Sequence, residues 1–210
     1  MDQENQSELH LPHVFFRPWV GKHYGPTSQL GMPVMVLGES HWCTSEEAIN
    51  RDFTVELMQH IVDGRRYRYW TEIARVFPGQ DNAAGNSGAF WNSVMFYNYI
   101  QESVGDAPRI RPTPAMWEKG APPFLEVLAR YQPRLVLAVG KQLWDHLPKI
   151  GRSGPSIVLG NRERESWLYA HPAGEALALW IYHPASPKWW SDHWAPWLGA
   201  ALELARRGPG

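Results

Sequence analysis

Three polar residues lie where the sequence predicts the ends of strands, and their types suit cleavage of the bond between a base and a sugar. Glu39 follows an apolar run, Asn98 lies among aromatic residues, and His183 precedes Pro184. Breaking an N-glycosidic bond creates a cationic sugar, which a carboxylate stabilises, and an anionic base, which a hydrogen-bond donor stabilises. Glu39 fits the first role and His183 the second, while the planar amide of Asn98 can read the edge of a pyrimidine.

Each of these residues also has a purely structural interpretation. Glu39 fits a helix cap or a solvated turn, and His183 fits the simple end of a strand. Asn98 can brace the backbone, since a buried amide without a hydrogen-bond partner costs about 1–3 kcal/mol. The catalytic interpretation therefore depends on whether the fold brings the three side chains together.

The elements that must position these residues are predicted from apolar runs and turn residues. The strands are residues 33–39, 91–100 and 134–139, and a hairpin of 167–170 and 176–182 that turns at 172–174. The helices are residues 45–62, 122–131, 141–146 and 190–207, with an irregular segment over 14–25 and a surface loop over 80–88. Strands separated by helices indicate a mainly parallel sheet with helices on both faces. Parallel strands end at one edge of the sheet, where Glu39, Asn98, Gly140 and His183 would meet.

Length and composition limit the class of protein. The 210 residues fit a single domain, predicted over residues 13–207 after a disordered lead of residues 1–12. The formal net charge of -1 provides no global attraction to nucleic acid, so such binding must come from a local basic patch. A single cysteine, Cys43, excludes an internal disulfide and a multi-cysteine metal site, and we expect no metal and no cofactor.

The same sequence lacks targeting and membrane signals. The polar, acidic amino terminus lacks the pattern of a signal peptide, and no run approaches the roughly 20 apolar residues of a membrane span. We therefore expect a cytoplasmic protein that does not contact a membrane.

Four short motifs resemble the uracil-DNA glycosylase superfamily, and they occur in its order. Gly38-Glu-Ser-His-Trp42 resembles the first motif, in which a strand-end glycine precedes an acidic or amide residue. Phe96-Tyr-Asn-Tyr99 resembles the strand with the base-reading asparagine, Leu135–Lys141 the third strand and turn, and His183-Pro-Ala-Ser-Pro187 the motif whose loop enters the minor groove. The resemblance covers most of residues 18–200. It implies an α/β fold, a three-layer α/β/α sandwich with a mainly parallel central four-stranded sheet.

The resemblance also implies an activity, namely that of a monomeric, monofunctional DNA glycosylase. Such an enzyme flips a nucleotide out of double- or single-stranded DNA, hydrolyses its N-glycosidic bond and leaves an abasic site. Glu39 and His183 would be catalytic. Base recognition would involve Asn98, Trp42, Phe53, His41 and Ser40, with Trp42 or Phe53 stacking on the base. DNA contacts would come from Lys141, Ser186, Lys188, Trp189, Arg65, Arg66 and Arg68, with Lys188, Trp189 or Trp190 filling the gap in the base stack.

The chain departs from the superfamily in its first motif. His41 stands where proline is common, and Trp42 stands where a tyrosine or a glycine is common. Because that tyrosine excludes the thymine methyl group in the uracil enzymes, a preference for uracil does not carry over. With one cysteine, the chain cannot hold the iron–sulfur cluster of one branch of the superfamily. Glu39 rather than Ser40 is assigned the catalytic position because only Glu39 can be anionic.

The amide of Asn98 widens the range of substrates. Rotated by half a turn, it presents the complementary pattern and reads cytosine as well as uracil. The expected substrate is therefore uracil or a modified pyrimidine, including the modified cytosines of viral DNA. Action on viral DNA would make the protein a defence enzyme.

Two other functions stay open on the sequence. The same fold without catalysis would give a nucleic-acid-binding protein, and a site for small molecules would give a hydrolase of free nucleosides or nucleotides. The three arginines between residues 65 and 68 alternate with aromatic residues. That pattern suits phosphate contact and base stacking, and it suits an incidental solvated cluster equally well.

Overall fold

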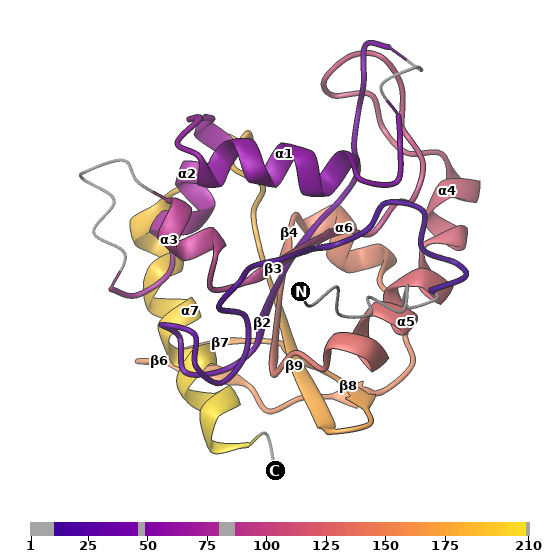
Figure 1. Ribbon diagram of the computed structural model, residues 1–210. Coiled ribbons are helices and arrows are strands. Elements are labelled where there is room, and N and C mark those ends of the chain that lie inside the picture. The colour runs from indigo at the N-terminus through magenta and orange to yellow at the C-terminus, as the bar shows by residue number, and fades with distance from the viewer. Residues whose placement is uncertain (1–10, 46–48, 80–86, 209–210) are drawn as a thin grey trace, which may run out of the picture.

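The computed structural model describes residues 11–45, 49–79 and 87–208 and has a mixed α/β fold built on one seven-stranded sheet (Figure 1). The strands of this sheet are β1 (Trp19–Val20), β2 (Val34–Gly38), β3 (Met95–Asn98), β4 (Leu135–Val139), β5 (Arg152–Ser153), β8 (Trp167–His171) and β9 (Gly174–Ile181). A separate two-stranded hairpin consists of β6 (Ile157–Leu159) and β7 (Arg162–Arg164). The helices are α1 (Phe53–Val62), α2 (Arg68–Arg75), α3 (Gly88–Trp91), α4 (Pro114–Lys119), α5 (Ala121–Tyr131), α6 (Lys141–His146) and α7 (Ser191–Arg207).

The centre of the sheet is parallel. The strand order is β1-β3-β2-β4-β9-β8-β5, and β3, β2, β4 and β9 run parallel to one another. The outer strands β1, β8 and β5 pair antiparallel, so the sheet has seven strands where the sequence analysis expected four. The register places Gly38 opposite Asn98 and Val139 opposite Ile181. The expected convergence of the four strand ends at one edge is therefore confirmed.

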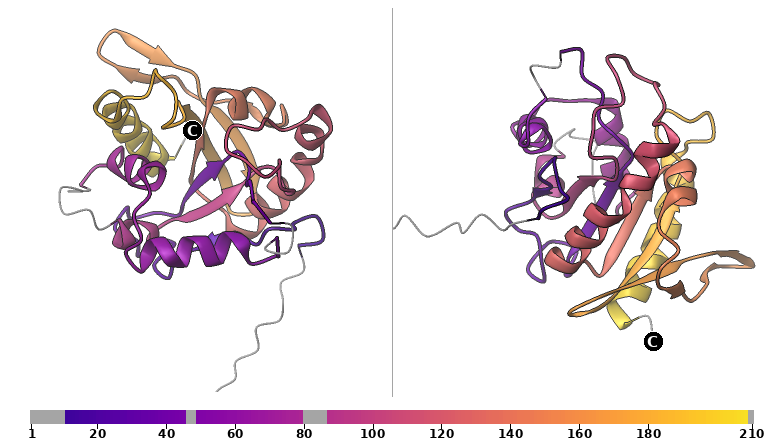
Figure 2. Two further views of the ribbon diagram at one scale, coloured as in Figure 1. Left: turned by 90° about the horizontal axis from the view of Figure 1, so that it is seen from above. Right: turned by 90° about the vertical axis from the view of Figure 1, so that its right-hand side faces the viewer.

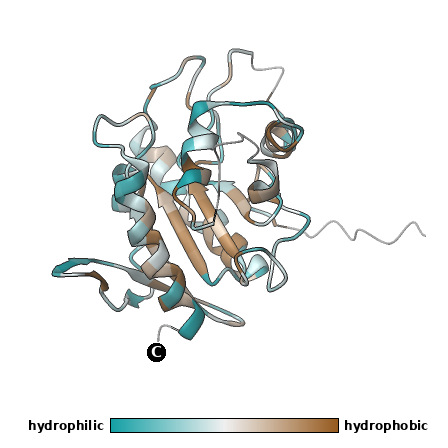
Figure 3. Ribbon diagram, turned by 90° about the vertical axis from the view of Figure 1, so that its left-hand side faces the viewer, coloured by the Kyte–Doolittle hydropathy of each residue, from teal (hydrophilic) through white to brown (hydrophobic). Residues whose placement is uncertain are grey.

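Helices cover both faces of the sheet, and each face has its own apolar core. Every residue of β2, β3 and β4 is buried, which explains why these strands appear in the sequence as continuous apolar runs. Side chains such as Val36 and Leu137 pack with α1, α2, α3 and α7, whereas Leu37 and Val136 pack with α4, α5 and α6. Figure 2 shows the two groups of helices on opposite sides of the strands, and Figure 3 shows the hydrophobic strands between more hydrophilic helices.

Several predicted strands and helices are confirmed, and they are the ones whose ends were most clearly marked in the sequence. The strands near residues 33–39 and 134–139, the hairpin of β8 and β9, and the helices α5, α6 and α7 all form close to their expected bounds. Gly140, with φ of +137°, lets the chain turn from β4 directly into α6, and its N–H donates to the carbonyl of Ile181 at 2.8 Å.

Two predicted elements are wrong in extent. The helix expected from residue 45 begins only at Phe53, because Asn50 Oδ1 accepts a hydrogen bond from the N–H of Asp52 at 2.7 Å and so favours a turn. The strand expected over 91–100 is only Met95–Asn98. Its aromatic start is helical instead, and Ser93 Oγ donates to the carbonyl of Ala89 at 3.1 Å at the end of α3.

Other predictions fall partly outside the described residues. These are the lead at residues 1–10, the acidic helix start at 46 and 47, and the loop at 80–86. The segment expected to be irregular over 14–25 contributes β1, and the strands β5, β6 and β7 had no predicted counterpart. None of the described helices is long and apolar enough to cross a bilayer.

Candidate functional site

Glu39 lies at the carboxyl end of β2 and forms an ion pair with Arg111. The Nη2 of Arg111 donates to Oε2 of Glu39 at 3.0 Å, and the Glu39 side chain is 15% exposed. Arg111 also donates to Oε1 of Gln142, on α6, so its guanidinium joins the ends of two neighbouring strands. The backbone carbonyl of Glu39 accepts a hydrogen bond from Ile100 at 2.9 Å, which holds the turn after β2 against the chain leaving β3.

The surroundings of Glu39 favour a proton on its carboxyl group more than water does. Burial raises the pKa of Glu39, and the charge and hydrogen bond of Arg111 lower it only in part, so the pKa stays above its usual value. A carboxylate with a raised pKa holds a proton more readily and is therefore a stronger base than a carboxylate in water.

Asn98 ends β3 directly opposite Gly38 and is 4% exposed. A Cβ at position 38 would overlap Oδ1 of Asn98 and would stand 2.8 Å from Cζ of Phe96. The missing side chain of Gly38 therefore makes room for the amide. Within the described part of the chain, no residue hydrogen-bonds the carboxamide of Asn98, whereas its backbone carbonyl accepts from Gln101 at 2.6 Å. Its carboxamide thus keeps hydrogen-bonding capacity that the described residues do not use.

His183 follows β9 at the same edge, and the backbone fixes its tautomer. The N–H of Ala185 donates to Nδ1 of His183 at 3.0 Å, so the neutral ring carries its hydrogen on Nε2. Burial of part of the ring and the positive charge of Arg111 lower the pKa of His183. His183 is thus a neutral imidazole with an Nε2–H donor, and it belongs to the exposed part of the surface.

Two further residues connect Glu39 with His183. The charge of Arg111 acts on both groups, as their pKa shifts show. The ring of Tyr69, from α2, lies 5.0 Å from the ring of His183, and burial together with the negative charge of Glu39 raises the pKa of Tyr69 well above its usual value. Arg111 and Tyr69 therefore link Glu39 with His183, while Asn98 ends the strand that pairs with β2.

The other residues of the first motif divide into buried and exposed positions. His41 is buried; its Nε2 lies 2.8 Å from Oγ1 of Thr54, and its ring packs edge-on against Phe16 and Phe53, each at 4.9 Å. Burial lowers the pKa of His41 to about 3. His41 and Phe53 thus join β2 to α1. Ser40 is partly buried and Trp42 is 46% exposed, which leaves Trp42 as the accessible aromatic residue of this motif.

The segment after His183 is a tight turn with one projecting ring. The carbonyl of His183 accepts from the N–H of Ser186 at 2.8 Å, and Oγ of Ser186 accepts from the N–H of Lys188 at 3.2 Å. The indole N–H of Trp189 donates to Glu72 on α2 at 3.0 Å, so Trp189 is held against the protein. Trp190 is 69% exposed and is the ring that projects.

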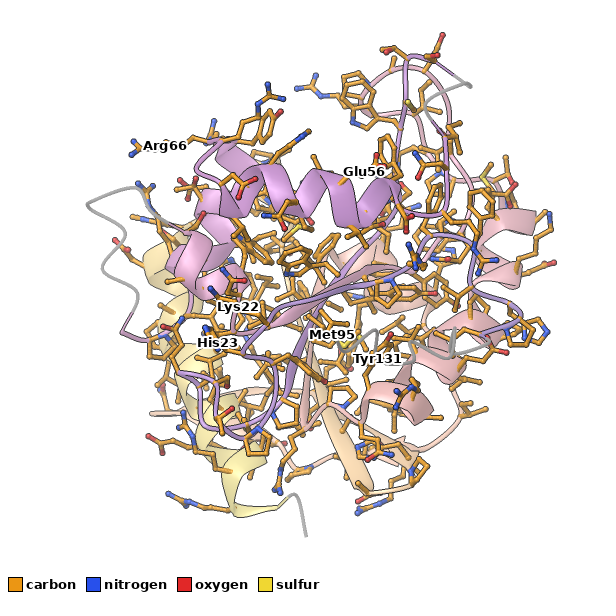
Figure 4. All side chains as sticks on the ribbon, viewed as in Figure 1. Lys22, His23, Glu56, Arg66, Met95 and Tyr131 are labelled. Atoms are coloured by element: carbon orange, nitrogen blue, oxygen red, sulfur yellow. The ribbon has the colours of Figure 1, made fainter. Side chains whose placement is uncertain are left out.

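The remaining predicted DNA contacts come from α6 and from the connection between α1 and α2. Lys141, at the start of α6, pairs with Asp145 and lies 5.5 Å above the ring of Trp180. Arg65 and Arg66 are exposed between α1 and α2, and Arg68 is exposed at the start of α2; Figure 4 shows Arg66 at the opposite end of α1 from Glu56. Of the aromatic residues that alternate with these arginines, Tyr67 is 41% exposed, while Trp70 is buried and Tyr69 contacts His183.

Sequence reasoning missed Arg111, Gln142 and His146, and it considered Tyr69 only as one of the aromatic residues that alternate with the arginines of residues 65–68. Arg111 belongs to a stretch of arginine and proline before the helix predicted over 122–131, and the sequence analysis gave that stretch no role. One signal was available, because a carboxylate at the end of a buried strand needs a nearby cation or a hydrogen-bond donor. Which cation provides it depends on the path of the loop between β3 and α4, which no local pattern encodes.

Within the described ranges, no three histidine, cysteine, aspartate or glutamate side chains gather closely enough to hold a metal ion. The arrangement offers instead a basic carboxylate, a carboxamide and a neutral imidazole donor at one sheet edge. No protein-family model matches the chain, and no curated protein is significantly similar to it.

Proposed function

We propose that this protein is a DNA glycosylase with the three-layer α/β/α sandwich of the uracil-DNA glycosylase superfamily. Helices on both faces of a sheet with four parallel central strands support that fold. The observation that carries the function is that Glu39, Asn98 and His183 lie at the carboxyl ends of strands that finish on one edge of the sheet.

These groups suit the two halves of N-glycoside hydrolysis. Glu39 accepts the proton of a water that attacks C1′ of the sugar, and its negative charge stabilises the oxocarbenium-like sugar. The base departs as an anion, and the Nε2–H of His183 donates to its oxygen. Because His183 is neutral, it stabilises the anion through a hydrogen bond and keeps its proton.

The substrate we propose is a flipped-out uracil or a modified pyrimidine. The carboxamide of Asn98 can match either uracil or cytosine, since no hydrogen bond from a described residue decides which end of the amide is the donor. The exposed ring of Trp42 is available to stack on the base. Modified cytosines of viral DNA are within this class, which would give the protein a role in defence.

Base release from labelled DNA tests this proposal. Duplex and single-stranded substrates carry uracil, thymine, cytosine or a modified cytosine, and alkali then cuts the abasic sites. We expect release of one of these bases, and we expect Glu39→Gln to abolish it. Glu175→Gln is the matched control, because Glu175 also pairs with an arginine, Arg152 at 2.7 Å, but lies at the start of β9, far from the strand ends.

A second candidate function is a non-catalytic binder of nucleic acid. The ion pair between Arg111 and Glu39 favours it, because a guanidinium beside the sugar would oppose the developing positive charge. Tight binding of base-containing DNA without base release, unchanged by Glu39→Gln, would support the binder. Release that depends on Glu39 would support the glycosylase.

A further inference from the structure

A continuous row of aromatic rings leads away from the proposed site. Tyr182, the residue before His183, packs against Trp180 at 5.2 Å and against Trp194 at 5.6 Å, and Trp180 lies 5.8 Å from Trp194. Trp194 belongs to the first turn of α7 and Trp197 to the next. The row therefore extends from the carboxyl end of β9 along the first two turns of α7.

Two arginines from β7 lie on this row. Arg164 stacks over the rings of Trp194 and Trp197 at 4.3 and 4.9 Å, and Arg162 lies 5.5 Å from the ring of Trp197. As residues i and i+2 of one strand, they point to the same face. Figure 2 shows the β6–β7 hairpin next to α7, on the side of the molecule away from α1.

These arginines have no acidic partner in the described part of the chain. Arg111, Arg75 and Arg152 each pair with a carboxylate at 2.7 to 3.0 Å, whereas Arg162 and Arg164 form no ion pair with a described residue. The Nε of Arg164 is buried and has no described acceptor. Burial and the neighbouring charge of Arg162 lower the pKa of Arg164, so the two guanidinium groups repel each other.

Two neighbouring guanidinium groups without an acidic partner in the described part of the chain favour the binding of an anion. Two like charges held close together are stabilised when a negative group binds between or beside them. A guanidinium that lies flat on an aromatic ring keeps its planar edge for two parallel hydrogen bonds to phosphate. Lys188, which lies 5.5 Å from the ring of Tyr182, extends the positive charge toward His183.

We propose that Arg162 and Arg164 form a phosphate-binding surface that holds the nucleic-acid backbone beyond the flipped nucleotide, with Lys188 linking it to the site. The identity of the polyanion rests on the proposed function. The near-zero net charge of the chain supports a local surface of this kind, since no global field would otherwise attract nucleic acid.

The salt dependence of DNA binding tests this surface. The affinity of the full-length protein is measured from about 50 to 200 mM salt on two otherwise identical duplexes, one with uracil and one with thymine. The slope of log affinity against log salt is negative. For Arg162→Ala, and for Arg162→Ala with Arg164→Gln, we expect its magnitude to decrease by about 0.9 for each phosphate that the variant no longer neutralises. Both duplexes should be affected equally, because backbone contacts carry no sequence information.

Arg130→Ala is the matched control, because Arg130 also lies over an aromatic ring, Tyr131 at 5.7 Å, but belongs to α5 on the other face. Near-ultraviolet circular dichroism checks that the tryptophan packing survives in each variant. An unchanged slope in the double variant, or an equal change in Arg130→Ala, overturns the inference. The inference is also overturned if the protein binds no DNA, or if the Arg162 variants lose only the binding to anionic phosphatidylglycerol vesicles. Base release is measured in a separate assay. If the protein releases no base but the arginine variants still change the salt dependence, the glycosylase proposal is rejected and the phosphate-binding surface is not.

Discussion

Gly38 makes room for the amide of Asn98 because it has no side chain. The two residues are paired across β2 and β3, and the space that a Cβ would need is filled by Oδ1 of Asn98 and the ring of Phe96. Packing against Asn98 and Phe96 therefore explains why this strand ends in glycine, independently of any resemblance to a protein family.

Gly38→Ala should therefore displace the amide of Asn98. We expect a loss of stability of about 1–3 kcal/mol from overpacking. Base release should fall about ten- to hundredfold, the equivalent of a bidentate contact to a base worth about 1–3 kcal/mol. Thermal unfolding and the base-release assay measure the two effects.

Gly199→Ala controls for the loss of a glycine. Gly199 lies in α7, where a Cβ would meet only Cγ of Pro78 at 3.8 Å, so the variant should be as stable as the wild type or more stable by about 0.5–1 kcal/mol. A Gly38→Ala protein with full base release would show that Asn98 does not need its present position.

Arg111 makes the site sensitive to pH in a defined direction. Its positive charge lowers the pKa of Glu39, so Arg111→Gln should raise that pKa further above its usual value. Glu39 would then become a carboxylate only at higher pH, and the acid limb of the plot of kcat/KM against pH should move upward. Arg152→Gln, which breaks a remote ion pair with Glu175, should leave the limb in place. An acid limb that is unchanged or moves to lower pH in Arg111→Gln would contradict the role given to Glu39.

At the scale of elements, a buried hydrogen bond connects the end of β2 with the start of α1. Nε2 of His41 lies 2.8 Å from Oγ1 of Thr54, and because burial lowers the pKa of His41 to about 3, the ring is neutral at physiological pH. The contact fixes α1 relative to the strand that carries Glu39.

Thr54→Val should remove this connection while keeping the side-chain volume. The ring nitrogen is then buried without a partner, which costs about 1–3 kcal/mol in the free energy of unfolding. Urea denaturation followed by circular dichroism measures this loss. Thr54→Ser keeps the hydroxyl and should be clearly more stable than Thr54→Val; equal stabilities would mean that the hydrogen bond contributes nothing.

Elements were predictable where apolar runs end sharply. The runs of β2 and β4 end at Gly38 and Gly140, and both strands were predicted within two residues. The run from Trp91 to Ile100 was assigned entirely to a strand, since aromatic residues favour strands, but tertiary packing places Trp91 in α3. The short strands β5 and β7 contain mostly polar, exposed residues, so they give no periodic signal.

The site was predictable as far as it depends on strand ends. Topology alone brings Glu39, Asn98 and His183 to one edge. Arg111 and Tyr69 reach the same edge from a loop and from a neighbouring helix, and their positions follow from packing between elements distant in sequence. His41 was assigned to base recognition, but its contacts with Thr54, Phe16 and Phe53 are those of a packing residue.

At the scale of the molecule, the two apolar cores share one sheet. Leu137 faces the core with α1, α2, α3 and α7, and Leu37, on the neighbouring strand, faces the core with α4, α5 and α6. Both side chains are fully buried. Because each strand contributes to both cores, neither core can unfold while the sheet stays intact.

Leu37→Ala and Leu137→Ala should therefore have the same kind of effect. Each should lower the free energy of unfolding by about 2–5 kcal/mol, the usual cost of a cavity in a core. Tryptophan fluorescence and far-ultraviolet circular dichroism should give one coincident urea transition in both variants. Separate midpoints for the two probes would mean that the faces of the sheet unfold independently.

The two outermost strands of the sheet are short, which limits strand pairing between copies of the chain. Its outermost strands, β1 and β5, have two residues each, and each pairs with one neighbour. A long, exposed edge strand is a template on which another chain can add a strand and begin to aggregate. Two residues offer little free backbone for such pairing, so β1 and β5 are themselves poor templates for strand addition.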